Sequence, residues 1–371
     1  MRKNIRPTAA AFAALALLAA ACGDSETTTA SAAPADAPTV VVTTNILGDV
    51  VRNIVGDQMN VETIMPVGAD PHDFQASAQQ VAFIEGADVM ITNGANFEEG
   101  LLDILVSATS EGVPTFEAID AVETIEFGED SHDEHEDEHE EHEGEEGHDE
   151  HEDEHEEHEG EEGHEEHEGE EGHEEHEGEE GHEEHEDEHG HAHDGADPHF
   201  FTDPARMAVA AEEIAHFLID TVEGIDAEVV QASADEYVAE LVALDAEVSE
   251  MFTGMSDDQR VLVTNHEVFG YFADNYDFEV VGTVIPSGST GDGANAADLV
   301  ELAEIIEQEG VPAIFADTSS SDELVQTLAE EVGDISVVEL FSESLGDADS
   351  DGATYVDMVR SNATNIAAAL S

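Results

Sequence analysis

Cysteine, tryptophan and basic residues are almost missing from this 371-residue chain. It has one cysteine, no tryptophan, and seven lysine and arginine residues against 94 aspartate and glutamate residues, so its formal net charge is -87 at pH 7. A single cysteine excludes an internal disulfide framework. The charge argues against binding to nucleic acid and against electrostatic docking to anionic membranes, because the surface repels phosphate groups. Cations are the natural partners of such a chain.

The acidity is unevenly distributed. Residues 129–194 contain 38 of the 94 acidic residues, which leaves 56 for the rest of the chain. We name residues 129–194 the His/Glu run. For the acidity outside it, the alternative interpretation is that negative charge only keeps the protein soluble, for instance in a salty habitat.

The N-terminus predicts export. A basic start leads into an apolar run that is too short to span a bilayer and ends at the single cysteine, Cys22. The small residues around Cys22 resemble a bacterial lipoprotein cleavage site, after which this cysteine carries lipid; the alternative is an ordinary cleaved signal peptide. We assign residues 1–22 to a lipoprotein signal peptide. Residues 23–38 are small, polar and proline-containing, which predicts a flexible tether.

From Thr39 onward, short apolar runs alternate with amphipathic helical stretches, and the alternation returns after a purely helical section. This pattern predicts an α/β fold with two Rossmann-like lobes of parallel strands, joined by helix. The predicted units are an N-terminal lobe over 39–202 that contains the His/Glu run, a helical section over 203–253, and a C-terminal lobe over 254–371. The predicted strands are residues 40–44, 61–67, 89–93, 114–119, 261–265, 279–284, 313–317 and 336–340. The predicted helices outside the helical section lie near residues 46–55, 101–108, 297–309, 322–332 and 355–370.

The His/Glu run is a near-repeat of HEEHEGEEG with a nine-residue period. It cannot bury a core, so we expect it to be disordered when empty. Neutral imidazole and carboxylate groups bind Zn, Cu and Ni, which predicts many weak, overlapping sites; the alternative is a merely solvated acidic loop. Its 17 histidines are His132, His135, His139, His142, His148, His151, His155, His158, His164, His167, His173, His176, His182, His185, His189, His191 and His193.

The run also contains HEDEH three times, which matches the H-E-x-x-H pattern of zinc proteases. That mechanism needs both histidines on one face of a helix that is supported by an apolar scaffold. Within a glycine-punctuated polar repeat, we interpret the three copies as accidents of the repeat and not as protease sites.

Four histidines lie outside the run, and the pentapeptide GADPH contains two of them, His72 and His199. The proline before each histidine fixes a backbone angle, so each imidazole projects from a rigid turn of the backbone. His266 follows a predicted strand and is expected to open a helix; strand ends of parallel sheets are where such folds gather ligands. His216 falls within a helical pattern and is interpreted as an ordinary helix residue.

The segments GADPHDF, ADPHFFTDPARMAVAAEEIA, NHEVFGYFADNY, IFADTSSSDELVQTLAEEVG, ELFSESLG and TYVDMVRSN, in this order, resemble the zinc and manganese solute-binding lipoproteins of bacterial ABC importers. The resemblance covers residues 39 to 371 apart from the His/Glu run. It implies two α/β lobes connected by a long rigid helix, with the metal between them. The implied ligands are His72, His199, His266 and Glu343. The family more often has Asp in place of Glu343, so water is the alternative fourth ligand, and Asp317 stands where the family commonly has Glu.

Three imidazoles with one carboxylate suit tetrahedral zinc, whereas manganese prefers more oxygen ligands. Manganese binders of the family also place a carboxylate where this chain has His266, and His-rich loops occur in its zinc members. The resemblance therefore implies a monomeric, non-enzymatic component that captures Zn²⁺ with high affinity. Lipid on Cys22 would hold it at the outer face of the bacterial cytoplasmic membrane, where it delivers zinc as cargo to a permease with an ATPase subunit.

Three alternatives remain at this point. One is a manganese importer component. Another is a surface zinc buffer or adhesin that acts mainly through the His/Glu run. The third is a zinc-dependent hydrolase with Glu267 as general base, which would need an open coordination position.

Overall fold

The structure, a computed structural model, describes residues 33–34, 37–126, 195–333 and 335–371. Cys22 and its proposed lipidation, most of the tether, and the His/Glu run with its 17 histidines and three HEDEH copies lie outside the described residues.

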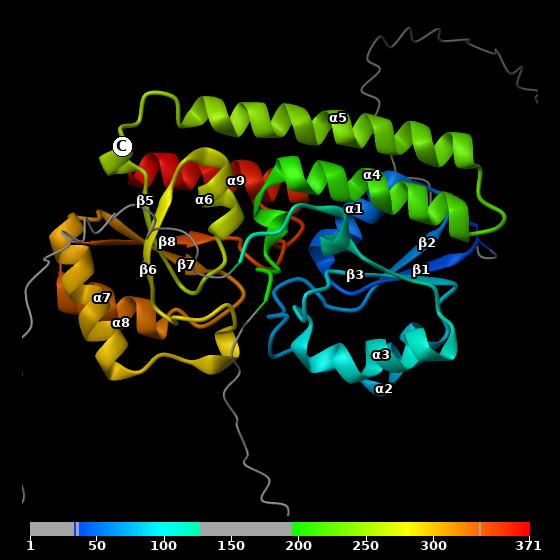
Figure 1. Cartoon of the computed structure of the whole chain (residues 1–371), viewed down its shortest axis with the longest axis horizontal. Helices are drawn as coiled ribbons and strands as arrows, with labels where there is room; N and C mark the ends of the chain where they lie inside the picture. The colour runs from blue at the N-terminus through cyan, green and yellow to red at the C-terminus, as the bar shows by residue number, and fades with distance from the viewer. Residues whose placement is uncertain (1–32, 35–36, 127–194, 334) are drawn as a thin grey trace, which may run out of the picture.

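Each lobe is built on a four-stranded parallel sheet (Figure 1). The strand order is β2-β1-β3-β4 in the N-terminal lobe and β6-β5-β7-β8 in the C-terminal lobe. The prediction of an α/β fold with two parallel-sheet lobes is confirmed. The strands are β1 Thr39–Val42, β2 Asn60–Thr63, β3 Val89–Thr92, β4 Thr115–Glu117, β5 Val261–Thr264, β6 Glu279–Thr283, β7 Ala313–Asp317 and β8 Ser336–Leu340.

Helices cover both faces of each sheet (Figure 1). In the N-terminal lobe, α2 and α3 lie on one face and α1 and α4 on the other; in the C-terminal lobe, α7 and α8 lie opposite α6 and α9. Among the described residues, no helix has the length and apolar character needed to cross a membrane. The helices are α1 Asn45–Val55, α2 Ala78–Glu85, α3 Leu102–Glu111, α4 Pro204–Thr221, α5 Ala227–Met251, α6 Gly270–Tyr276, α7 Ala296–Glu309, α8 Glu323–Val332 and α9 Tyr355–Ala369.

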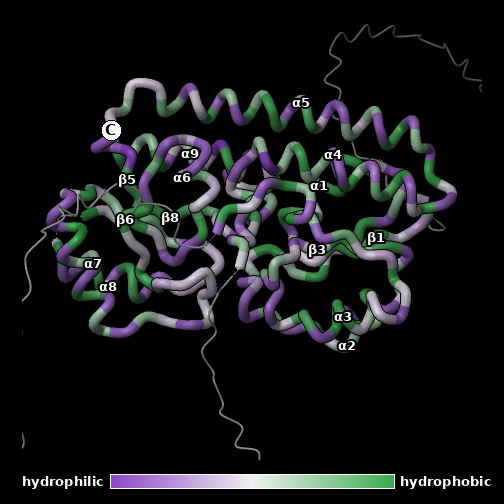
Figure 2. Tube along the Cα trace, in the orientation of Figure 1, coloured by the Kyte–Doolittle hydropathy of each residue, from purple (hydrophilic) through white to green (hydrophobic). Residues whose placement is uncertain are grey.

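Helix α5 runs along both lobes (Figure 1). Its 25 residues give a length of roughly 37 Å, and it packs against α4, α1 and α9. Hydrophobic and hydrophilic residues alternate along it (Figure 2), so one face joins the core while the other meets solvent. The Asp226 side chain caps its N-terminus by accepting hydrogen bonds from the backbone of Glu228 and Val229.

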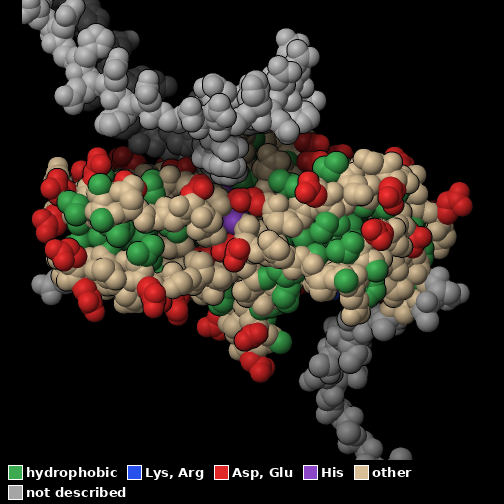
Figure 3. All heavy atoms as spheres, turned by 90° about the horizontal axis from the view of Figure 1, so that it is seen from below, with side chains coloured by type: hydrophobic (Ala, Val, Ile, Leu, Met, Phe, Trp, Pro, Cys, Tyr) green, Lys and Arg blue, Asp and Glu red, His purple; other side chains and the backbone are tan. Residues whose placement is uncertain are grey.

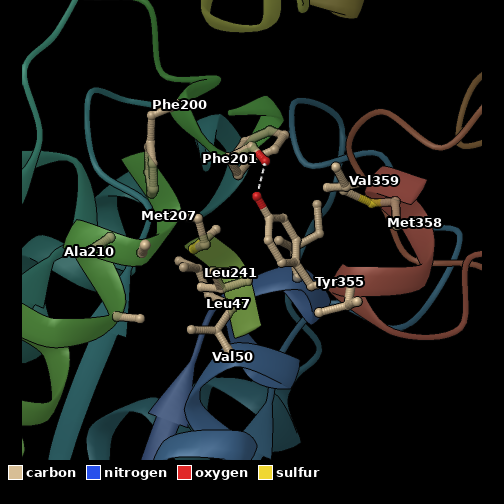
Figure 4. Packing of buried hydrophobic residues seen from close by; sticks show 14 of the residues in the cluster. Leu47, Val50, Phe200, Phe201, Met207, Ala210, Leu241, Tyr355, Met358 and Val359 are labelled. Atoms are coloured by element: carbon tan, nitrogen blue, oxygen red, sulfur yellow. Dashed lines mark hydrogen bonds between the residues drawn. The ribbon is translucent and has the colours of Figure 1, made fainter. Parts of the chain in front are cut away.

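One hydrophobic cluster is common to both lobes, and each lobe also has a smaller cluster of its own. A single cluster joins Leu47 of α1, Leu241 of α5 and Val359 of α9 (Figure 4). Within it the buried Tyr355 hydroxyl donates to the Phe201 carbonyl at 2.8 Å. A shared core and a common helix resist rigid-body motion between the lobes. Loop movement is therefore the motion that this fold permits most easily.

The predicted elements differ from the structure mainly at their ends. The strand predicted over 61–67 stops at Thr63, and Pro66 lacks the N–H that a continuing strand would need. The helix expected to open at His266 begins instead at Gly270, because the Thr264 hydroxyl donates to the His266 carbonyl at 2.7 Å and holds a turn there. The short helix α2 was not predicted.

Neighbouring residues of α5 allow a direct test of the shared core. Leu241 is 0% exposed and Val242 is 56% exposed. Leu241→Ala is expected to lower the free energy of unfolding by about 2–5 kcal/mol through the lost apolar contacts and the cavity left behind. Val242→Ala is expected to change it by less than about 0.5 kcal/mol. Denaturant unfolding of both variants checks this, and equal effects would contradict the packing described for α5.

Candidate metal centre

Four buried side chains from distant parts of the chain meet between the lobes. His72 follows β2, His199 directly precedes the 3₁₀ turn Phe200–Thr202, His266 follows β5, and Glu343 follows β8. One potential ligand atom from each lies within 4.8 Å of the others. Their exposed fractions are 7%, 0%, 0% and 1% in that order. The four residues implied by the family resemblance therefore converge on one buried point.

The sheet topology explains this convergence. In parallel sheets the loops after the carboxyl ends of the strands gather at one edge, where ligands bind. Here the two edges face each other. Asn45, just after β1, donates to the Ser344 hydroxyl at 2.9 Å and accepts from the Leu345 backbone at 2.7 Å, both just after β8. These bonds join the loop that carries Glu343 to the opposite lobe.

One carboxylate oxygen is the meeting point of the three histidines. The Nε2 atoms of His72, His199 and His266 lie 2.8, 3.3 and 3.2 Å from Oε1 of Glu343. Ligand atoms on a tetrahedral zinc ion, each about 2.0–2.1 Å from the metal, are separated by about 3.3 Å. The second oxygen of Glu343 and Nδ1 of His266 have no hydrogen-bond partner among the described residues. The arrangement fits a small divalent cation with three nitrogen ligands and one oxygen ligand.

Two further carboxylates face the far sides of the imidazole rings. Asp197 Oδ1 lies 2.7 Å from Nδ1 of His199, and Glu99 Oε1 lies 2.9 Å from Nδ1 of His72. A carboxylate at Nδ1 fixes the ring so that Nε2 points to the metal, and it raises the basicity of that nitrogen. Sequence reasoning missed both residues. The repeated GADPH could have indicated Asp197, whereas no local pattern marks Glu99.

Aromatic rings pack tightly against the histidines. The Phe97 ring lies 5.3 Å from the His72 ring and 5.5 Å from the His199 ring, in edge-on contacts. Phe97 follows Ala95 and Asn96, whose φ angles of 49° and 61° are uncommon for residues other than glycine. Buried Glu98 holds this loop by accepting from the Thr43 hydroxyl at 2.5 Å and from the Asn93 backbone at 2.6 Å. The strained loop thereby presents an apolar wall that keeps water from the rings.

The charges of the site balance one another. Burial alone would raise the pKa of Glu343, but the facing histidines hold it well below its usual value. Burial opposes protonation of His72 and His199, yet neighbouring carboxylates outweigh it: Glu343 and Glu99 raise the pKa of His72 to about 10, and Asp197 and Glu343 raise that of His199. Without a metal, protons on His72 and His199 balance the charge of the buried carboxylate. A divalent cation would take their place.

The other residues considered from sequence lie outside this group. Asp317 accepts from the backbone and hydroxyl of Ser319 at 2.8 and 2.6 Å, and burial together with the charge of Glu343 raises its pKa. His216 lies on the surface of α4, 3.5 Å from Glu213. Glu267 is not one of the grouped residues; its backbone donates to the Ser287 carbonyl at 3.0 Å.

Known proteins resemble this chain over nearly its whole length. The sequence profile of the family described as zinc-uptake complex component A, periplasmic (ZnuA), matches residues 40–369. "Zinc-binding protein TroA" of Treponema pallidum (strain Nichols) is 27% identical over 347 residues, which cover 90% of this chain and 89% of that protein. "Manganese-binding lipoprotein MntA" of Halalkalibacterium halodurans is 23% identical over 361 residues, which cover 96% of each.

Solved structures share the fold. The periplasmic zinc-binding protein TroA from Treponema pallidum superposes with a TM-score of 0.68 and 25% identity, covering 90% of this chain and 99% of that chain. A manganese-bound periplasmic metal-binding protein from Candidatus Liberibacter asiaticus gives a TM-score of 0.66 with 18% identity, covering 90% of this chain and 100% of that chain. The latter likeness bears on the fold alone.

Binding of a divalent cation at this centre is expected to release protons. A metal ligand must be a neutral imidazole, whereas a pKa raised from 6.5 to about 10 keeps His72 protonated in the metal-free protein at pH 8. Zinc affinity should therefore rise with pH between 6.5 and 10, by up to about tenfold per pH unit for each proton released. Calorimetry at pH 8 in buffers of different ionisation enthalpy measures this release.

Glu343→Gln is the control for that measurement. It keeps the shape of the side chain but removes the charge that raises the pKa of His72, so fewer protons should leave on binding. Zinc binding with no proton release by the unaltered protein would contradict the charge balance described above.

Proposed function

Since this chain belongs to the family of the periplasmic zinc-uptake component ZnuA, we propose that Zn²⁺ is the ion that it captures, through His72, His199, His266 and Glu343. The chain is a metal-binding, substrate-binding component of an ABC metal importer and is not an enzyme. The observation that carries the choice of zinc is the convergence of three imidazole nitrogens on one carboxylate oxygen. The metal is cargo.

The ligand set supports zinc over manganese. Three imidazole nitrogens and one carboxylate suit a four-coordinate tetrahedral ion, whereas Mn²⁺ favours oxygen ligands and higher coordination numbers. Relatives are named for both metals, so the choice rests on the ligands of this chain. Glu343 is proposed as the fourth ligand in preference to water, because its Oε1 already lies about one tetrahedral edge from each histidine.

Delivery follows from the proposed location. Similar proteins are named lipoproteins of metal ABC transporters, which supports an extracytoplasmic, membrane-anchored component. We propose lipid on Cys22 as the anchor at the outer face of the cytoplasmic membrane, with zinc passed to a permease and its ATPase. The 17 histidines of the His/Glu run are proposed as an accessory, weaker zinc-binding tract that raises the local zinc concentration.

The decisive experiment is a competitive titration of the protein lacking residues 129–194 with zinc and manganese. The structure favours this deletion, because Glu126 and Ala196 form a β-bridge and the Asp197 backbone donates to the Ile125 carbonyl at 2.9 Å. The two ends are therefore neighbours that a short linker can join. One tight zinc ion with much weaker manganese binding is expected.

Single His→Ala changes at 72, 199 and 266 locate that ion. Each is expected to weaken zinc binding by more than about 100-fold, because even residues that only orient a ligand contribute about 10- to 100-fold. His216→Ala, on the exposed surface of α4, is the matched control and should leave affinity unchanged. Retained affinity in any one of the three removes that residue from the proposed site. Loss of all tight binding on deletion of the run would favour the surface buffer instead.

Replacement of Glu343 distinguishes between its carboxylate and a water molecule as the fourth ligand. Glu343→Ala is expected to weaken zinc binding by at least about tenfold, and Glu343→Asp to retain most of the affinity because the carboxylate remains. Cobalt substitution gives an independent readout, since the visible spectrum of Co²⁺ reports its ligands. Unchanged affinity and spectrum in Glu343→Ala would assign the fourth position to water.

A further inference from the structure

The two GADPH corners have the same sequence but different contacts. In both, the Asp Oδ1 accepts a hydrogen bond at 2.9 Å from the backbone of the histidine two residues later. In the second corner, Asp197 also faces the ring of its own histidine. In the first, Glu99 occupies that position, and Oδ2 of Asp70 accepts instead from the Thr290 hydroxyl at 2.6 Å. Asp70 thus bonds to the opposite lobe.

A cavity lined by both polar and apolar residues lies between the lobes on this side of the centre. Its volume is about 830 Å³, and its walls include Asp70 and Asp73 from one lobe and Asn265, Thr290 and Ser320 from the other. Asp70 and Asp73 flank His72 in the chain, and Asn265 precedes His266. The cavity is therefore lined by the segments that carry two of the proposed ligands, although none of the four ligand side chains lines it, and its carboxylates and hydroxyls can bind a hydrated cation.

The most exposed of the four proposed ligands is His72, whose chain segment lines this cavity. His72 is 7% exposed, whereas the other three proposed ligands are at most 1% exposed. In the view from below, histidine surface is visible between the two lobes with acidic side chains around it (Figure 3). An ion that approaches here meets His72 first.

We propose that this cavity is the route by which the cation reaches and leaves the centre, and that the Asp70–Thr290 hydrogen bond is a latch that closes it after capture. The inference rests on the proposed metal site. The latch can open without parting the lobes, because Thr290 belongs to the segment SGSTGDG, whose three glycines allow local rearrangement. The shared core and α5 remain in place.

The latch bond ends on Oδ2 of Asp70, whereas the bond that holds the His72 backbone ends on Oδ1 of the same carboxylate. Asn45 and the Gly68 backbone bond to Ser344, next to Glu343, so breaking those contacts would disturb a proposed ligand directly. The Thr290 hydroxyl donates only to Asp70 among the bonds described. Removing that hydroxyl therefore breaks the latch bond and leaves the bond from the His72 backbone to Oδ1 of Asp70 in place.

The test is zinc release from the full chain into excess fluorescent chelator, measured by stopped flow. Thr290→Val should release zinc roughly tenfold faster, the size expected for loss of a hydrogen bond to a charged group, while the association rate changes little. Thr290→Ser keeps the hydroxyl and should behave as the unaltered protein. Thr327→Val is the matched control, because Thr327 also lines the cavity but its hydroxyl donates to the Glu323 carbonyl within α8 at 2.7 Å.

Release from Thr290→Val at the unaltered rate would overturn the latch. Equal acceleration in Thr290→Ser or in Thr327→Val would also overturn it, because the effect would then not come from the hydroxyl that faces Asp70. Failure of the unaltered protein to hold zinc would contradict the proposed function instead. In that case the release measurements on the same variants are repeated with Mn²⁺ as the probe, and their result tests whether the latch exists.

Discussion

The structure of the centre depends on the burial of one carboxylate among three imidazoles. An isolated buried carboxylate is strongly unfavourable, so Glu343 needs positive charge around it. Protonated His72 and His199 supply that charge when the metal is absent, and a divalent cation would supply it when present. The same four side chains therefore form a stable arrangement in both states. This explains why the four buried side chains can remain closely packed without a metal.

The surroundings keep the imidazoles at that point. Asp197 and Glu99 fix two rings from behind, and Phe97 packs edge-on against both. Behind these residues lies a core common to both lobes, crossed by α5 along its whole length. A frame of this kind resists hinge motion between the lobes, so capture and release of the metal depend on local movement of loops. The segment that contains Thr290 lies between the lobes, and it is the part of the structure where such local loop movement is available.

The repeated Asp-Pro-His corner illustrates how environment assigns a role. Both copies make the same backbone bond to their histidine, which is the part that five identical residues can encode. Their remaining contacts differ because one aspartate faces its own imidazole and the other faces the opposite lobe. Identical sequence thus orients a ring in one copy and connects the lobes in the other.

The sequence by itself determined the alternation of strands and helices, with β7 and β8 placed to the residue, because hydrophobic periodicity is a local property. The order of motifs also determined which histidines to consider. Only the tertiary structure decided that Glu99 faces His72, 27 positions away, and that Thr290 meets Asp70 across 220 positions. Such pairs carry no local pattern: Glu99 and His72 follow different strands of one sheet, and Thr290 and Asp70 meet only where the strand ends of the two sheets face each other.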